Sequence, residues 1–180
     1  FCYSQYETVA SRYGENDMTR LQKLTAFLRA NLPESLFATE FSSEMDDIEF
    51  KPAHSDLGKD ESDKEQYQML TQEYEAVIAW GRWPYREVDA RYIPVLIEAW
   101  RQELETDLTE PDFDDEQPTM SVDVIDDNIA MVIVTLKLSD AIVLKEDEKG
   151  MVPFNDKRYS LANPEVLFAE NIDVIPRGVK

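Results

Sequence analysis

The sequence predicts an α+β domain in which two α-helices cover one face of a largely antiparallel β-sheet. Two stretches carry apolar residues at helical spacing, and several shorter ones are β-prone or alternate apolar and polar residues. The elements follow in the order α-β-β-β-α-β-β. Runs of strands, rather than strict alternation of strand and helix, favour helices gathered on one face of the sheet.

The length and composition fit one domain with an additional arm. The chain has 180 residues, of which 43% are hydrophobic, so it can bury a core without disulfides, and its only cysteine is Cys2. We expect the domain over residues 18–145 and a C-terminal arm over 146–180. Residues 1–17 are expected to be a disordered leader or the product of upstream translation. The chain lacks an initiator methionine, and the codons before Met18 can encode a ribosome-binding sequence.

The first helix is predicted to begin after Thr19 and to end near Asn31. Thr19 and Gln22 form a capping-box pattern, in which each side chain satisfies a free backbone N–H. Pro33 prevents easy continuation. Apolar residues recur along it at helical spacing: Leu21, Leu24, Phe27, Leu28 and Leu32.

Three strands are expected before the second helix. Residues 35–43 and 47–53 are short β-prone runs that a turn at 44–46 would join into a hairpin, and 55–66 is polar enough for an exposed loop. The third strand, 67–80, is predicted to end at Gly81. It carries apolar side chains on one face, at Tyr74, Ala76, Ile78 and Trp80.

The second helix lies in the stretch "ARYIPVLIEAWRQELE", residues 90–105. Asp89 can cap it, and Pro94 is tolerable only in or near the first turn. We interpret its apolar stripe as the surface that seats the helix on the sheet. The stripe contains Ile93, Leu96, Ile97, Trp100 and Leu104, widened by Val95 and Ala99.

Two strands are expected after the second helix, joined by a turn at Asp126–Asn128. The first alternates apolar and polar residues over 119–125, and the second sets Val132, Val134, Leu136 and Leu138 on one face. Residues 139–150 either extend this strand or begin another. The remaining tail shows no clear period and is expected to pack on its own domain or on a neighbour.

No catalytic, cofactor-binding or metal-binding motif is present in the sequence. His54 is the single histidine, and a surface position at a strand end is expected for it. The acidic run at 112–116 lacks the spacing of an EF-hand loop, because Gln117 and Asp123 occupy positions that need glycine and glutamate. We expect a solvated acidic loop and no enzyme activity.

The charge is strongly one-sided. The net charge is −20, and no Lys or Arg occurs between Arg101 and Lys137, which disfavours nucleic-acid binding and suggests a negative face. No apolar run approaches the roughly 20 residues that span a bilayer, and we expect a soluble cytoplasmic product without membrane contact. Candidate interface residues combine aromatic and charged side chains: Trp83, Tyr85, Arg101, Asp112, Asp114, Asp115 and Glu116.

Taken together, these segments resemble the tail completion protein R family of Peduovirus-type contractile-tail phages. The resemblance covers roughly 21–144. It is carried by "LQKLTAFLRANLP", "YEAVIAWGRW", "YIPVLIEAWRQE" and "VDVIDDNIAMVIVTLKLSDAIVL", above all by Ile93-Pro94-Val95-Leu96 with Trp100-Arg101 and by "LKLSDAIVL". The leader, the acidic 55–66 segment and the tail after Lys145 depart from the family pattern.

The resemblance implies a non-enzymatic structural protein that caps the tail tube and prepares it for head joining, within the virion tail assembled in the bacterial cytoplasm. By analogy with phage tail-terminator folds it also implies a hexameric ring that contacts tube, sheath and head–tail connector. Two alternatives stay open on the residues alone: an acidic adaptor or DNA mimic that binds a basic partner, and a metal-assisted enzyme.

Overall fold

The computed structural model describes residues 19–60, 62–104 and 117–162. The helices are α2 (Arg20–Asn31), the 3₁₀-helix η1 (Glu34–Phe37) and α3 (Tyr92–Leu104). The strands are β1 (Phe41–Lys59), β2 (Glu65–Trp83), β3 (Thr119–Val124), β4 (Ala130–Glu146), β5 (Val152–Phe154) and β6 (Lys157–Leu161). These strands form one sheet in the order β1-β2-β4-β6-β5, and β3 also pairs with β4. All the pairs are antiparallel, as the sequence predicts.

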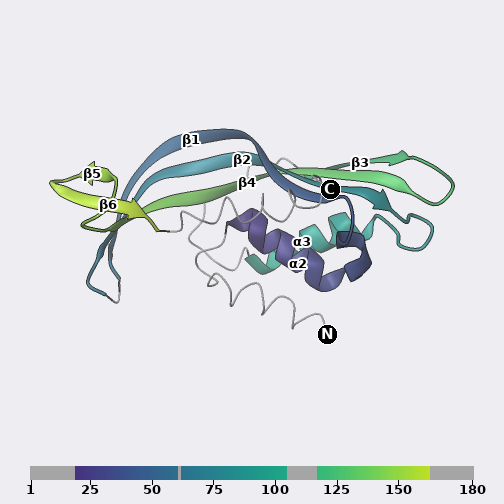
Figure 1. Ribbon diagram of the computed structural model, residues 1–180, viewed down its shortest axis with the longest axis horizontal. Coiled ribbons are helices and arrows are strands. Elements are labelled where there is room, and N and C mark those ends of the chain that lie inside the picture. The colour runs from purple at the N-terminus through teal and green to yellow at the C-terminus, as the bar shows by residue number, and fades with distance from the viewer. Residues whose placement is uncertain (1–18, 61, 105–116, 163–180) are drawn as a thin grey trace.

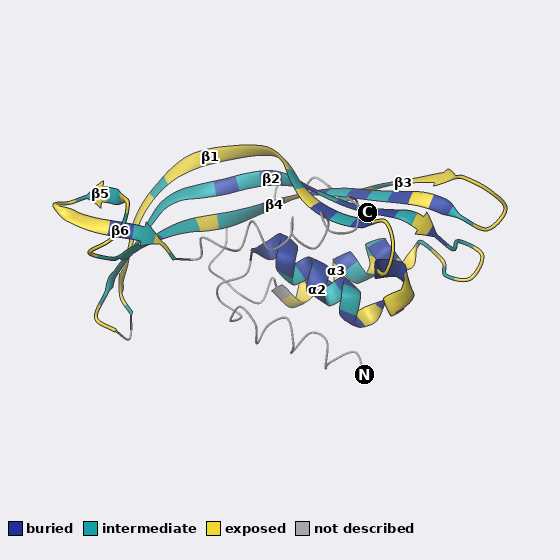
Figure 2. Ribbon diagram, viewed as in Figure 1, coloured by how far each residue is buried: buried dark blue, intermediate teal, exposed yellow. Residues whose placement is uncertain are grey.

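The sheet has two halves that differ in what covers them (Figure 1). The helix-covered half comprises residues 41–46, 74–83, 119–124 and 130–138, and both α2 and α3 lie against one of its faces. The extended half comprises 47–59, 65–73 and 139–146 together with β5 and β6, and no helix of the described residues covers it. Figure 2 shows that the buried positions are concentrated in the helix-covered half and the helices.

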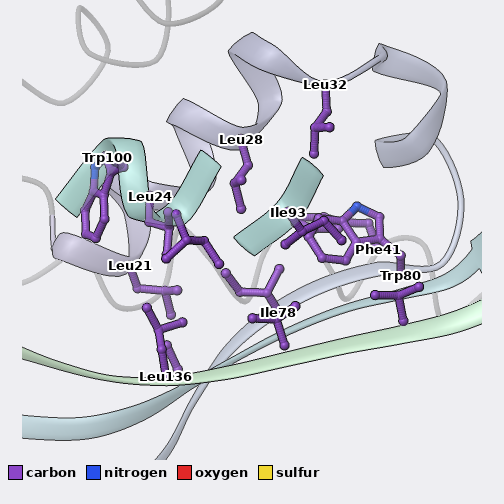
Figure 3. Close-up of a cluster of buried hydrophobic side chains, with 14 of the residues drawn as sticks. Leu21, Leu24, Leu28, Leu32, Phe41, Ile78, Trp80, Ile93, Trp100 and Leu136 are labelled. Atoms are coloured by element: carbon purple, nitrogen blue, oxygen red, sulfur yellow. The ribbon is translucent and has the colours of Figure 1, made fainter. Parts of the chain in front are cut away.

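Helix α2 begins and ends as predicted. The Thr19 side chain accepts the backbone N–H of Gln22, and the Gln22 side chain accepts that of Thr19, each at 3.1 Å. In Figure 3 its leucines point toward the sheet, where they meet Ile78 and Leu136. Leu21, Leu24 and Leu28 are fully buried. This burial, more than helix propensity, stabilises so short a helix.

Helix α3 presents a narrower apolar stripe than the sequence suggests. Ile93, Ile97 and Trp100 are buried, but Val95 is 63% exposed and Ala99 is exposed as well, so the expectation that these two widen the stripe is wrong. Positions one or two residues from a core position point away from the sheet in a helix that contacts it along one line.

One part of the core is an aromatic cluster. Phe37, Phe41, Trp80 and Trp83 pack edge-on or tilted, with neighbouring ring centroids 4.8–6.1 Å apart. Such geometry is favoured by the ring quadrupoles. The Arg29 guanidinium lies 5.1 Å from the ring centroids of both Phe37 and Phe41, and so covers this cluster from α2.

Three expectations about the first half of the chain are wrong. The run 35–43 is not one strand, because Glu34–Phe37 form the 3₁₀-helix η1 and β1 begins only at Phe41. Residues 44–46 do not turn, because β1 continues from Phe41 to Lys59 through a register shift between Asp46 and Glu49. Asp47 takes a φ of 48° there, which aspartate tolerates, so its turn-like sequence marks a β-bulge. Residues 55–66 are largely strand as well, with the chain reversing only around 60–64.

The second half of the chain holds more strands than expected. β4 is one continuous strand to Glu146, which settles the question left open for residues 139–150. β5 and β6 then form a hairpin on its end, within the part expected to be an arm. The described chain therefore has two strands before α3 and four after it, where three and two were expected.

Candidate assembly surfaces

The aromatic residues that the sequence singled out lie at the end of β2 and in the connection after it, and they differ in burial. Trp80 and Trp83 are both buried, and the Trp83 indole N–H donates to the Val88 carbonyl at 2.8 Å. Tyr85 is only partly buried, and its hydroxyl donates to the Asp126 carbonyl at 3.1 Å. The connection is thereby held against the β3–β4 turn, and Tyr85 offers the accessible aromatic surface there.

The other predicted interface residues are separated from this connection along the chain. Arg101 lies in the last turn of α3 and is partly buried. Asp112, Asp114, Asp115 and Glu116 lie outside the described residues. Of the predicted set, the described residues contain only Trp83, Tyr85 and Arg101, and the interface role of the set stays a prediction.

The sheet face opposite the helices carries acidic residues in register. Asp46 lies directly across from Glu75, and Glu49 directly across from Glu73. Residues paired in this way share one face, and like charges directly opposite each other destabilise a sheet. Lys51 forms an ion pair of 2.7 Å with Glu73, and Lys137 stands directly across from Glu75 on the neighbouring strand β4. An acidic surface on the sheet itself is thus built in, beyond the acidic loop that the sequence suggested.

A polar network closes the far end of the extended half. The Lys157 ammonium lies 3.1 Å from a Glu65 carboxylate oxygen, and the Tyr159 hydroxyl donates to the same oxygen at 3.2 Å. These contacts, with Lys157 first, lower the pKa of Glu65. Nearby, a 2.6 Å ion pair and hydrogen bond with Lys145, together with backbone N–H donors, lower the pKa of Asp60.

The extended half also has a small aromatic cluster of its own. The Phe154 ring lies 4.8 Å from that of Tyr67 and 5.9 Å from that of Tyr159, measured between centroids. Elsewhere in the extended half, large apolar side chains remain on the surface: Phe50 is 56% exposed, Leu57 47% and Met151 91%. An open hollow lies beside the β5–β6 turn, lined among others by Phe154, Glu146 and Lys157.

At the border of the two halves, a carboxylate anchors α2 to β4. Asp140 accepts the Tyr74 hydroxyl at 2.6 Å and the backbone N–H of Arg20, in the first turn of α2, at 2.8 Å. The Tyr74 hydroxyl in turn accepts the N–H of Leu21 at 3.3 Å. Desolvation raises the pKa of Asp140 against these hydrogen bonds, and it raises that of Tyr74 still more strongly. The site joins helix to sheet.

The sequence pattern did not reveal several of these features. Asp140, Glu65 and Lys157 are single polar residues whose partners lie 66 to 120 positions away in the chain, so spacing alone gives no signal for them. His54 is exposed at a bulge of β1, close to the surface position expected for it. The described residues contain no group of three or more His, Cys, Asp or Glu that could hold a metal ion. Their helices are all too short or too polar to cross a membrane.

The comparisons with known proteins decide the family. The sequence matches the family model of the P2 phage tail completion protein R (GpR) over residues 18–164. The chain belongs to this family. The match spans both helices and all six strands of the described fold. The resemblance inferred from "YIPVLIEAWRQE" and the β3–β4 hairpin is thereby confirmed.

A phage relative agrees with this assignment. The chain is 27% identical over 156 residues to an uncharacterised 19.2 kDa protein in the rep-hol intergenic region of Haemophilus phage HP1 (strain HP1c1). The alignment covers 87% of this chain and 89% of that relative. No solved structure was found to match. The chain is thus a phage tail completion protein, a structural class.

Proposed function

We propose that this tail completion protein caps the tail tube and prepares it for head joining, as a homo-oligomeric ring in the virion tail that assembles in the bacterial cytoplasm. The single observation that carries this proposal is the family match over the whole described fold, residues 18–164. The protein would act by binding tube, sheath and connector proteins and would need no catalytic centre. Hexameric symmetry is proposed by analogy with tail terminators.

The shape of the sheet supports a role in binding. β1 and β2 each run for 19 residues and β4 for 17, whereas strands in globular proteins average about 5–6. The helix-covered half alone houses the main core. Strands that continue well past the core need another purpose, and contact with neighbouring proteins supplies one. We assign that contact to the extended half and its exposed Phe50, Leu57 and Met151.

The acidic surface fits a channel for DNA. Acidic side chains face one another across β1 and β2 on the helix-free face, and the chain carries a net charge of −20. If this face and the basic-free segment from Gln102 to Leu136 line the lumen of a ring, phosphates are repelled and DNA slides without binding. Residues 1–17 and 146–180 would flank the ring-forming domain as leader and contact arm.

Genetic complementation tests the proposal. In a phage or prophage that encodes this chain, a null mutation is expected to give full heads and tails that fail to join, with tails of abnormal length. The purified protein should restore infectious particles when added to the mutant lysate. Normal joined virions from the null mutant would overturn the proposal. Tight binding of a soluble basic nuclease or polymerase by the purified protein would favour the acidic adaptor instead.

A further inference from the structure

The edge of β4 that faces away from β2 carries two short partner strands with a gap between them. β3 pairs with its first part, 130–135, and β6 with its last part, 144–146, and both lie on the same side. Between them, at Ser139 and Ala141, β4 meets no strand of the described residues on this side. The opposite side of β4 is paired with β2 along its length.

The hydrogen-bond alternation shows which groups point to this edge. Ile125 N–H donates to the Ile129 carbonyl at the β3 end, and Ala162 N–H donates to the Val143 carbonyl at the β6 end. Backbone groups of alternate residues point to the same side in an antiparallel ladder. The N–H and C=O groups of Ser139 and Ala141 are therefore directed toward the interrupted edge, ready to bond an added strand.

The other long edge of the sheet is protected against pairing, and this one is not. β1 has three register shifts along its length and contains Pro52 and several acidic side chains. Bulges, prolines and charges of this kind discourage the addition of a strand. β4 keeps a regular register with no extra residue on its own side. Within the part of the chain that the structure describes, this regular edge has no partner strand between Thr135 and Leu144, and such an edge calls for one.

The chain leaves the described structure beside this edge. β6 runs antiparallel to β4, and Ala162, the last described residue, donates its N–H to the Val143 carbonyl of β4. Residues 163–180 contain two runs of strand-forming residues, at 166–169 and 172–175. The intervening acidic segment 105–116 contains no comparable run. The C-terminal segment is the part of the chain suited to the edge.

Direct continuation of the same chain along β4 is disfavoured. In the register set by Leu144 and Leu161, Pro164 would stand opposite Ala141 at a hydrogen-bonding position, where it has no N–H to donate. Glu165 would stand opposite Asp140, a partly buried carboxyl that already resists ionisation. Two carboxylates facing each other at that point would destabilise the pairing.

We propose that residues 163–180 of a second copy of the chain add a strand to this edge of β4, at Ser139 and Ala141. A segment that arrives from a neighbour is free to choose its register and to place its apolar runs there. Because donor segment and acceptor edge are different surfaces, the contact is heterologous, and repetition of it closes a ring when the rotation allows. The inference rests on the proposed function, since it supplies the contact by which that oligomer forms.

Cysteine trapping between separately prepared proteins tests the contact. In a Cys2→Ser background, one preparation carries Ala141→Cys and the other Val166→Cys or Val174→Cys. Mixing and mild oxidation should give covalent heterodimers, because the two cysteines meet only between copies. The matched control carries Glu44→Cys in place of Ala141→Cys. Glu44 is exposed on the protected strand β1, and this variant should give no heterodimers. Absence of heterodimers with Ala141→Cys overturns the proposal. A cross-linked monomer from a chain carrying both cysteines, without heterodimers, shows pairing within one copy and also overturns it.

A truncated chain that ends at Ala162 gives an independent readout. Adding a synthetic peptide of residues 163–180 should slow amide exchange at Ser139 and Ala141 by about tenfold or more, and leave β2 unchanged. A peptide without effect contradicts the inference. The proposed function can fail independently of this contact. If the truncated chain still completes tails, the proposed contact of the C-terminal segment is wrong and tail completion stands. If the full chain is dispensable for tails, tail completion itself is wrong.

Discussion

The two halves of the sheet share three long strands but are stabilised in different ways. In the helix-covered half, side chains of α2, α3 and the sheet bury one another completely, with Trp80, Ile78 and Leu24 at most 1% exposed. In the extended half, a small aromatic cluster and exposed ion pairs hold a sheet that keeps Phe50 and Met151 on its surface. The first arrangement stabilises a monomer, and the second leaves surface for partners.

This difference indicates that one half of the sheet provides most of the folding stability and that the other half is available for binding. Burial of apolar surface is the main source of folding free energy, and it is concentrated around the helices. Surface ion pairs contribute little each, so the extended half is expected to open more readily than the rest. Contact with neighbouring subunits would then order it further. The following predictions test this division, beginning with the largest expected effect.

Truncation of a core aromatic residue should be far more costly in the helix-covered half. Trp80→Ala should lower the free energy of unfolding by about 3–5 kcal/mol, because it removes a fully buried side chain from the aromatic core. Phe154→Ala, its counterpart in the extended half, should cost about 1 kcal/mol, since that ring is only partly buried. Urea denaturation of both variants measures the contrast. Equal losses would show that the two halves form one core.

Overpacking at Gly150 should loosen the extended half alone. A Cβ added there would overlap the backbone carbonyl of Tyr159, so the β5–β6 hairpin must move away from its present position. Gly150→Ala should cost about 1–3 kcal/mol, and amide exchange should quicken in β5 and β6 but not in α2. Faster exchange in α2 as well would contradict the separation of the halves.

On acidification, the extended half should be weakened at a higher pH than the Asp140 contacts that hold α2 to β4. The lysine partners of Glu65 and Asp60 lower the pKa values of these carboxyls from 4.5 and 3.8. The stability that the two carboxylates contribute is therefore present above pH 4.5 and 3.8, and it is lost as the pH falls through their lowered pKa values. The pKa of Asp140 is raised from 3.8, mainly by desolvation, so its contribution is complete below 3.8 and lost as the pH rises through the raised value.

NMR spectra recorded between about pH 7 and pH 3 check this opposite behaviour. Amide signals of β5 and β6 should broaden or shift first on acidification, while those of Arg20 and Leu21 at the Asp140 anchor persist. Asp140→Asn should abolish the pH dependence of the anchor and leave that of the hairpin. Simultaneous loss at both places would contradict the prediction.

Neutralising one of the facing acids should slightly stabilise the monomer. Asp46→Asn removes the like-charge pair with Glu75, leaves Lys137 across from Glu75 on β4, and should raise the free energy of unfolding by about 0.2–1 kcal/mol. The matched control is Glu44→Gln, which faces the uncharged Val77 and should change little. The gain should shrink as salt is added, because salt screens the repulsion. No difference between the two variants would contradict the prediction that the facing acids repel each other.

Sequence patterns predicted the elements whose signals are local. The Thr19 capping box, the alternation from Tyr74 to Trp80 and the turn at Asp126–Asn128 are each specified within a few residues, and each is present. The bulge at Asp47 was interpreted as a hairpin turn, because a bulge and a turn favour the same polar residues. Val95 and Ala99 show that periodicity gives the centre of an apolar stripe better than its width.

The surfaces were harder to predict than the elements. Glu65 meets Lys157, and Asp140 meets Arg20, only because distant strands and helices are brought together by the fold. Trp83 has arginine and tyrosine as sequence neighbours, which is typical of an interface residue. In the structure its side chain is buried, and its indole N–H donates to the Val88 carbonyl. Composition could indicate an acidic surface, but only strand register shows that acids face one another on the sheet.

The most direct test of the account compares two surface variants in the complementation assay. Phe50→Ser with Leu57→Ser removes exposed apolar side chains from the extended half, and Tyr92→Ser with Val95→Ser removes equally exposed ones from α3. Both proteins should unfold at the temperature of the unaltered protein, since none of the four side chains is buried. The account predicts that the α3 variant restores infectious particles to the null mutant and that the extended-half variant does not. Full restoration by the extended-half variant would contradict it.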